Sequence, residues 1–224
     1  DVDVLLIRSV TKVNRELLEG TAVKFVGTAT IGLDHIDTDW LTEQNIKFTN
    51  APGCNSIAVA EYVLSGLLVI AEKYDIDLRI TKVGIVGAGN VGTAISERLD
   101  IIGIPYVLYD PPLQQGGDQR AMVDEKELST CEFMTFHVPL TTEKESQWPT
   151  EQMVNASFLT KMKSMKYLIN SSRGHVINGE ALKDWLDSNN QHQAIIDVWE
   201  NEPFIDCDVV EKCFLSTPHI AGHT

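Results

Sequence analysis

Positive charge is scarce in this sequence. Its 224 residues include 18 lysines and arginines against 32 aspartates and glutamates, which gives a formal net charge of −14. A chain with this balance lacks the basic surface needed to bind nucleic acid or an anionic membrane. A small anionic molecule can still bind, through a few arginines placed locally.

Cysteines and long apolar runs are scarce too. The four cysteines form no C-x-x-C pair and no metal-ligand spacing with histidine, so we expect no metal site and reduced thiols, as in a cytoplasmic protein. The longest apolar stretch, LLVIA at 67–71, is far too short to cross a bilayer. No signal peptide is recognisable, and the chain opens on DVDVLLIRS without an initiator methionine, which suggests a fragment.

Apolar runs of strand length alternate with helical patterns along almost the whole chain. Continuous Val, Ile and Leu runs of this kind are typical of strands covered on both faces, as in a parallel sheet. The pattern at 55–74 predicts one long buried helix, whereas LQQGGDQR at 113–120 reads as a soft loop. The sequence therefore predicts an α/β fold with a domain boundary near the start of the long helix.

A glycine-rich turn follows one of the buried runs. The stretch VGIVGAGNVGTAISERL at 83–99 contains G-x-G-x-x-G between a predicted strand and an amphipathic helix. Gly87 permits a tight turn, Gly89 lets a pyrophosphate approach the backbone, and Gly92 allows close helix–strand packing. With Asn90 and Val91, these glycines open a helix whose free N–H groups can bind phosphate. The alternative is an ordinary strand–turn–helix with packing glycines.

An acidic residue ends the next predicted strand. Asp110 follows the last glycine by about the 20 residues expected for an acid that binds the adenosine ribose. Its carboxylate would accept hydrogen bonds from ribose hydroxyls and repel a 2′-phosphate. The sequence therefore favours NAD over NADP as cofactor.

Three further polar signals follow later strands. INSSRG at 169–174 places Arg173 beyond a buried run, DVWENEP at 197–203 places Asp197 and Glu202 around the next, and STPHIAG places His219 after the last. Ligands of doubly wound sheets bind outside the carboxyl ends of the strands, so these side chains are expected to converge there. Taken singly, each has a plainer reading as a surface arginine, a solvated glutamate or a structural histidine.

This order of motifs resembles the D-isomer-specific 2-hydroxyacid dehydrogenases, which combine the glycine turn, an Arg-Gly turn, an acid followed by proline, and a Pro-His pair. RSVTKVN, KFVGTATIGLDHID, APGCN and YDPP extend the resemblance over essentially the whole chain. The resemblance implies oxidation of a phosphorylated 2-hydroxy acid by NAD. In that reaction Arg173 binds the substrate carboxylate, His219 is the acid/base and Glu202 is its partner.

The resemblance also implies the remaining contacts. Asp197 is expected near the nicotinamide, and cofactor contacts are expected from Asp110, Val138, Ser171, Ser172 and Gly222. Substrate contacts are expected from Ser9, Thr30, Arg173 and His223, and Arg8 is the candidate for a substrate phosphate, with a surface arginine as the competing interpretation.

Two positions depart from the family pattern. Position 138 is Val, where the family usually has a Thr whose side chain contacts the cofactor. Position 223 is His, where close relatives have a Tyr that reaches the substrate. His223 therefore also competes with His219 for the acid/base role, and only the P-H-x-x-G match favours His219.

The resemblance predicts two domains. Residues 56–224 are expected to form a doubly wound parallel sheet, the Rossmann NAD-binding domain, and residues 1–55 a partial flavodoxin-like substrate-binding domain. Full-length members continue into a dimerisation domain, so a homodimer is expected. Another D-2-hydroxyacid dehydrogenase, of the 3-phosphoglycerate or glycerate type, and a non-catalytic NAD-binding scaffold remain alternatives.

Overall fold

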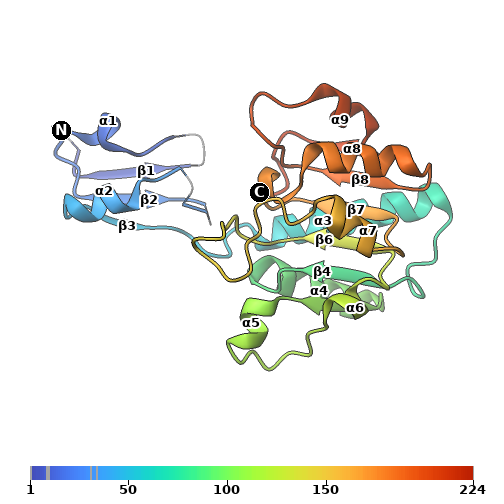
Figure 1. The fold of residues 1–224 in the computed structure, drawn as a ribbon. Helices are drawn as coiled ribbons and strands as arrows, with labels where there is room; N and C mark the ends of the chain where they lie inside the picture. The colour runs from blue at the N-terminus through green and yellow to red at the C-terminus, as the bar shows by residue number, and fades with distance from the viewer. Residues whose placement is uncertain (1, 9–10, 31, 34, 224) are drawn as a thin grey trace. The chain divides into compact units, whose positions relative to one another are not determined.

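A computed structural model of the chain describes residues 2–8, 11–30, 32–33 and 35–223 (Figure 1). It divides into two compact units, Asp1–Asn55 and Ser56–Thr224. The functional roles predicted for these two parts remain predictions. Within the described residues, no helix combines the length and the apolar character that a membrane span needs.

The first unit is a small parallel sheet with two short helices. Its strands pair in the order β1-β2-β3, with Val4 beside Phe25 and Phe25 beside Lys47. A core of seven buried side chains, among them Val26 and Leu41, holds the unit together. Its elements are β1 (Val4–Ile7), α1 (Arg15–Leu18), β2 (Phe25–Thr28), α2 (Thr38–Glu43) and β3 (Lys47–Thr49).

The second unit is a six-stranded sheet with helices on both faces. Its elements are α3 (Ser56–Tyr74), β4 (Val83–Val86), α4 (Asn90–Ile102), β5 (Tyr106–Tyr109), α5 (Pro111–Gln115), α6 (Glu125–Leu128), β6 (Phe133–Phe136), α7 (Ala156–Lys161), β7 (Tyr167–Asn170), the 3-10 turn η1 (Gly174–Val176), α8 (Gly179–Ser188), β8 (Gln193–Ile196), α9 (Cys207–Lys212) and β9 (Leu215–Ser216). The predicted α/β architecture and the doubly wound parallel sheet are confirmed.

The strand order β5-β4-β6-β7-β8-β9 reverses direction at β4, and every pairing is parallel. The register aligns the carboxyl ends of five strands, at Val86, Tyr109, Phe136, Asn170 and Ile196. The residues that directly follow these ends therefore share one edge of the sheet. That edge, at a point where the strand order reverses, is where ligands bind in doubly wound folds.

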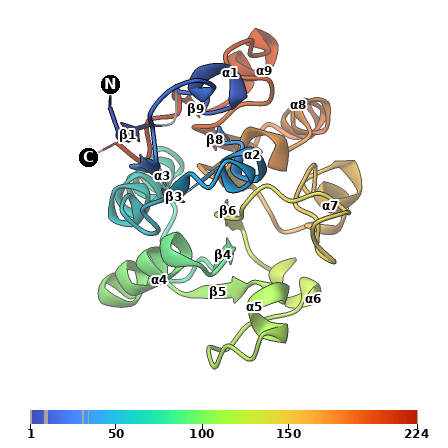
Figure 2. The same cartoon turned by 90° about the vertical axis from the view of Figure 1, so that its left-hand side faces the viewer.

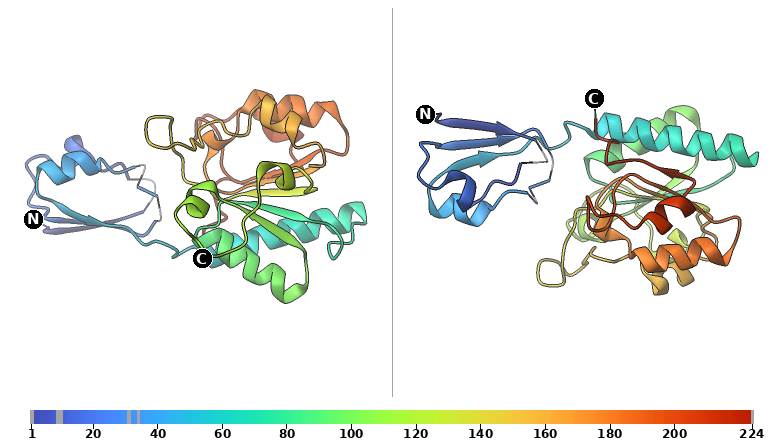
Figure 3. Two further views of the ribbon diagram at one scale, coloured as in Figure 1. Left: turned by 60° about the horizontal axis from the view of Figure 1, so that its bottom comes forward. Right: turned by 90° about the horizontal axis from the view of Figure 1, so that it is seen from above.

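Two apolar cores lie on opposite faces of this sheet. In Figure 2, α3 and α4 lie on one side of the strands and α7 and α8 on the other. The long helix α3 runs along the sheet (Figure 3) and is buried through Val63, Leu67 and Ile70, which explains its mostly apolar sequence. The opposite core includes Trp185 and Leu186 of α8. Burial on both faces is the reason the strands read as unbroken apolar runs.

The prediction of a soft loop at 113–120 was wrong in its first part. Helix α5 extends to Gln115, because Asp110 caps it by accepting a hydrogen bond from the N–H of Leu113 (3.0 Å) and prolines occupy its first two positions. Proline is preorganised for a first helical turn, and its missing N–H would have had no helical partner there.

Candidate active site

The glycine turn after β4 is packed as its sequence predicts. Gly87 has φ +94°, a conformation that favours glycine, and a Cβ there would lie 3.0 Å from Val138 Cγ1 and still closer to the His137 carbonyl. A Cβ on Gly92 would lie 3.0 Å from the carbonyl carbon of Gly87. These two glycines therefore allow the turn and the close approach of α4 to it.

Gly89 differs from its neighbours, because a Cβ there would have no protein atom within 4 Å. It is the N-cap of α4, and no side chain caps that helix end. Gly89 and Asn90 are exposed, and Val91 is half-buried. A helix N-terminus in this state attracts an anion such as a pyrophosphate.

Asp110 lies beside this turn, as expected for the ribose-binding acid. Its Oδ2 accepts a hydrogen bond from the N–H of Ala88 (2.8 Å), while Oδ1 caps α5. A carboxylate has about four lone-pair sites, so acceptor capacity remains for ribose hydroxyls. Its role toward a ribose stays a prediction.

The Arg-Gly turn after β7 is organised by a buried asparagine. Asn170 Oδ1 accepts bonds from the N–H and the hydroxyl of Ser172, and Asn170 Nδ2 donates to the carbonyl of Arg173 (3.0 Å). Arg173 itself donates from Nη1 to the carbonyl of Ser172 (2.8 Å). By contrast, the buried Ser171 Oγ has no hydrogen-bond partner among the residues that the structure describes.

Asp197 holds the segment that carries His219. It is 1% exposed, and its carboxylate accepts hydrogen bonds from Thr217 Oγ1 (2.6 Å) and from the N–H groups of Ile220 (2.8 Å) and Ala221 (2.9 Å). Its carbonyl accepts one from the N–H of His219 (2.7 Å). These bonds give Asp197 a structural function, in addition to the role near the nicotinamide that the sequence predicts for it.

His219 has φ +56°, a left-handed conformation that is uncommon for a residue with a side chain. Such a conformation persists only where the surroundings enforce it, and the bonds to Asp197 do so here. The His219 side chain is 49% exposed. The strained turn therefore presents the imidazole to solvent at the carboxyl edge of the sheet.

Glu202 and His219 form a close pair. His219 Nδ1 lies 2.9 Å from Glu202 Oε2, and Glu202 Oε1 accepts from the N–H of Trp199 (2.7 Å). Because a carboxylate only accepts, Nδ1 carries the hydrogen and Nε2 is left to exchange a proton elsewhere.

The electrostatics of the pair follow from this geometry. The hydrogen bond to Glu202 raises the pKa of His219, although burial and the positive charge of Arg173 oppose the rise. Burial acts to raise the pKa of Glu202, but the hydrogen bonds from His219 and Trp199 outweigh it and the pKa is lowered. The positive charge of Arg173 acts on both groups, as the smallest of these contributions.

The Arg173 turn and the Glu202 loop touch through their backbones. A Cβ on Gly174 would lie 2.6 Å from the amide nitrogen of Glu200 and closer still to the Trp199 carbonyl. Only glycine fits at this contact. It therefore sets the spacing between the turn that carries Arg173 and the loop that carries Glu202.

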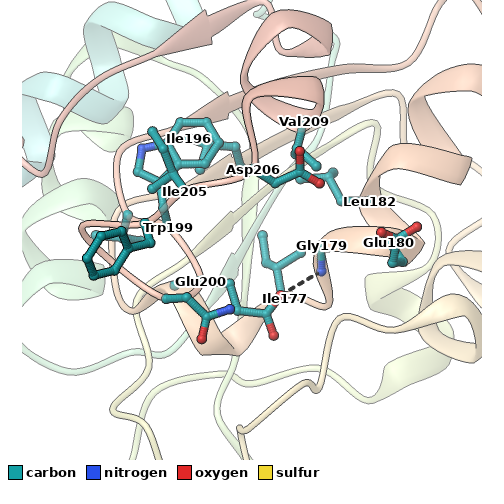
Figure 4. A pocket seen from close by; sticks show the side chains of 14 residues that line it. Ile177, Gly179, Glu180, Leu182, Ile196, Trp199, Glu200, Ile205, Asp206 and Val209 are labelled. Carbon is teal, nitrogen blue, oxygen red and sulfur yellow. Dashed lines mark hydrogen bonds between the residues drawn. The ribbon is translucent and has the colours of Figure 1, made fainter.

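A cavity of about 310 Å³ lies beside the same loop (Figure 4). Among its lining residues, Glu200 accepts from the N–H of Gly179 through Oε2 (3.2 Å), the bond drawn in the figure. Glu200 Oε1 accepts from Gln152 Nε2 (3.0 Å). The first bond attaches the Glu202 loop to the N-terminal end of α8, and the second attaches it to the segment before α7.

The remaining predicted residues are placed as follows. Val138 packs beside Gly87, and Gly222 follows the turn held by Asp197, directly before the exposed His223. In the first unit, Arg8 is exposed, and Thr30 Oγ1 donates to the carbonyl of Gly32 (2.9 Å). Ser9 lies outside the described residues. The substrate contacts predicted for these positions remain predictions.

Sequence reasoning missed several residues that support the site. Tyr62 Oη lies 2.7 Å from Thr217 Oγ1, which links α3 to Asp197. His137 adjoins the glycine turn, but burial lowers its pKa to about 3, so it is neutral near pH 7. No local signal in the sequence marks Tyr62. His137 directly follows β6, so its position resembles that of the other strand-end residues.

Comparison with known proteins identifies the family. The model of the D-isomer specific 2-hydroxyacid dehydrogenase NAD binding domain matches residues 69–221. The chain belongs to the D-isomer-specific 2-hydroxyacid dehydrogenases. The family resemblance predicted from the motifs is confirmed, and so is the NAD-binding domain.

Several relatives resemble the chain over its whole length. Erythronate-4-phosphate dehydrogenases of Marinobacter nauticus and Pseudoalteromonas atlantica are 48% and 47% identical to it over 100% of the chain. The chain spans 59% and 60% of those proteins.

Solved structures of the family have the same fold. A NAD-dependent formate dehydrogenase of Staphylococcus aureus in complex with NAD has a TM-score of 0.78 at 28% identity, over 100% of this chain and 74% of that one. A 3-phosphoglycerate dehydrogenase of Entamoeba histolytica with bound NAD⁺ has a TM-score of 0.81 at 25% identity, over 100% of this chain and 73% of that one.

The residues at the carboxyl edge of the second unit's sheet fit NAD. Gly89 leaves the space that a pyrophosphate needs, and the N-terminus of α4 offers its N–H groups there. Asp110 has acceptor capacity for ribose hydroxyls, and the partnerless Ser171 Oγ lies after β7, at the edge where cofactors bind.

Proposed function

We propose that the protein oxidises 4-phospho-D-erythronate at C2 to (3R)-3-hydroxy-2-oxo-4-phosphooxybutanoate. The balanced reaction converts the hydroxy acid and NAD⁺ into the 2-oxo acid, NADH and one proton. NAD, when bound, accepts the hydride that leaves C2. The observation that carries this proposal is the Glu202–His219 pair beside Arg173, in a chain 48% identical to a protein with that named activity.

His219 is the proposed base. Its Nε2 takes the proton of the C2 hydroxyl as the C2–H bond breaks, and in the reverse direction it returns that proton to the carbonyl oxygen. Glu202 keeps the hydrogen on Nδ1, fixes the ring orientation and stabilises the imidazolium that forms. The raised pKa of His219 favours the imidazolium that forms when the ring takes this proton.

Arg173 is the proposed carboxylate ligand. A guanidinium binds a carboxylate through two parallel hydrogen bonds, which orients the substrate as well as holding it. The contact of Gly174 with Trp199 keeps that guanidinium near the Glu202–His219 pair. The proposal therefore assigns orientation to Arg173 and proton transfer to His219.

The phosphorylated substrate is favoured over the alternatives by similarity. The named erythronate-4-phosphate dehydrogenases are 43–48% identical to the chain, whereas the 3-phosphoglycerate dehydrogenase structure is 25% identical. We assign the substrate phosphate to Arg8, with Ser9 and Thr30 as further ligands. We also propose a homodimeric cytoplasmic enzyme that acts in pyridoxal 5′-phosphate biosynthesis.

Turnover of several acids tests this proposal. The full chain is assayed with NAD and 4-phosphoerythronate, erythronate, 3-phosphoglycerate or glycerate, and 4-phosphoerythronate is expected to have the highest kcat/KM. A preference for 3-phosphoglycerate would contradict the substrate. NAD binding without turnover of any of the acids would favour the scaffold alternative.

A matched pair of histidine variants tests the assignment of the base. His219→Gln is expected to reduce turnover about 10²–10⁴-fold, the range for loss of an acid/base group. His223→Gln alters an exposed histidine four residues away and is expected to cost far less. The reverse order would transfer the base to His223.

A further inference from the structure

Asp118 and Arg120 form a fork in the loop after α5. Asp118 Oδ1 accepts from the Arg120 N–H (2.9 Å) and from Nε (2.9 Å), while Oδ2 accepts from Nη2 (2.7 Å). The two side chains are 22% and 35% exposed. These hydrogen bonds lower the pKa of Asp118 to about 2, so the carboxylate is charged under all ordinary conditions.

A chain of hydrogen bonds connects Arg120 to the glycine turn. Its third nitrogen, Nη1, donates to Thr93 Oγ1 (2.8 Å) in the first turn of α4, and Thr93 Oγ1 donates to the carbonyl of Ala88 (3.3 Å). The N–H of Ala88 in turn donates to Asp110. The charge of Asp110 also contributes to the raised pKa of Arg120, after that of Asp118. The guanidinium therefore lies beside the glycine turn and Asp110, where the adenosine end of NAD is expected.

The chain contains a second fork with the same spacing. Asp77 accepts from the N–H of Arg79 (3.0 Å), from its Nε (2.9 Å) and from its Nη2 (2.8 Å). This pair lies between α3 and β4, at the amino end of the strand and away from the glycine turn, and its Arg79 side chain is 78% exposed. It serves as an internal reference for a fork without a cofactor nearby.

We propose that Asp118 is a second determinant of cofactor choice, because it holds the Arg120 fork that would otherwise bind the 2′-phosphate of NADP. NADP differs from NAD by that phosphate, and a guanidinium fork is the side chain best matched to it. All three guanidinium nitrogens donate within the chain. With Asp110 and Asp118 around one guanidinium, a net negative charge also opposes the phosphate.

Equilibrium titrations with NADH and NADPH, in the absence of any hydroxy acid, test this inference. Asp118→Asn keeps the shape but removes the charge and one acceptor oxygen, and the affinity for NADPH is expected to rise about tenfold. That change corresponds to one charge-assisted hydrogen bond of about 1.4 kcal/mol. The affinity for NADH is expected to stay within about twofold, and the gain for NADPH is expected to shrink as salt is added.

Three further variants complete the test. Asp77→Asn breaks the reference fork and is expected to change neither affinity. Asp118→Ser keeps a side-chain oxygen that can accept from the Arg120 N–H. It is expected to give the same gain in NADPH affinity, and it takes the place of Asp118→Asn if that variant folds poorly. Asp118→Asn combined with Arg120→Met is expected to lose the gain.

An unchanged affinity for NADPH in both Asp118 variants, with NADH binding intact, would overturn the inference. So would a gain that survives the loss of Arg120, since it would then arise from charge removal alone. Because the titrations contain no hydroxy acid, their outcome is independent of the proposed substrate.

Discussion

Replacement of Gly174 by alanine tests the backbone contact between the Arg173 turn and the Glu202 loop. The new methyl group would lie 2.6 Å from the Glu200 nitrogen and closer to the Trp199 carbonyl, and the obstacles are backbone atoms that cannot rotate away. Ordinary carbon contacts begin near 3.5 Å, so the two segments must separate by more than about 1 Å. Overpacking of this kind costs about 1–3 kcal/mol.

Two measurements follow from that shift. In a domain of this size each kcal/mol lowers Tm by about 2–4 °C, so a cost of 2 kcal/mol predicts a fall of roughly 4–8 °C in thermal unfolding. A displacement of 1 Å between orienting and proton-transferring groups predicts a loss of about 10²-fold in kcat under the proposed function. NAD binding at the glycine turn after β4 is expected to persist, because Gly174 follows a different strand.

Gly116→Ala is the matched control. Gly116 has φ −68° at the end of α5, and a Cβ there meets only the carbonyls of its own helix, at 3.3 and 3.4 Å. Its Tm is expected to stay level or rise slightly. If Gly174→Ala unfolds at the temperature of the parent and retains its turnover, the contact does not hold the two segments together and the reasoning fails.

Three further outcomes are expected. Glu202→Gln replaces the carboxylate whose hydrogen bond and charge raise the pKa of His219. The rate of hydroxy-acid oxidation, which rises with pH, is therefore expected to begin its rise at lower pH. An unchanged pH–rate profile, measured with deuterated substrate, would contradict the pairing. Asp110→Ser keeps a capping oxygen for α5 but removes the carboxylate that repels a 2′-phosphate. The preference for NAD over NADP, measured as the ratio of their association constants, is therefore expected to fall. An unchanged ratio would mean that Asp110 does not contact the ribose. Asp197→Ala leaves the N–H groups of Ile220 and Ala221 without their acceptor, and urea unfolding is expected to show a loss of about 3 kcal/mol or more; a loss below about 1 kcal/mol would mean that water replaces the carboxylate.

Much of the fold could be predicted from the sequence because burial on both sheet faces leaves a local trace. The apolar runs that alternate with helical patterns became the strands of the two described sheets, and the pattern at 55–74 became α3. The glycine turn was equally readable, since Gly87 and Gly92 are needed for contacts only a few residues away in the chain. The capped helix α5 within the expected loop was overlooked, although the two prolines after Asp110 signal it.

The sequence is enough to propose the residues of the candidate site, but it does not give the contacts that hold them. The sequence places Arg173, Glu202 and His219 after successive strands, and a parallel sheet brings such positions to one edge. It does not indicate that Asp197 holds the histidine turn through Thr217 and two N–H groups, because those bonds span 20 to 24 residues.

By itself, the sequence therefore determined three things: the succession of strands and helices along the chain, the family, and the residue types available at the strand ends. These follow from periodicity and from residue types that one local conformation requires. The tertiary structure alone decided which of two identical Asp-x-Arg forks lies beside the glycine turn, and that Gly174 packs against Trp199. Contacts of this kind depend on how distant segments pack, and no local pattern encodes the packing of one segment on another.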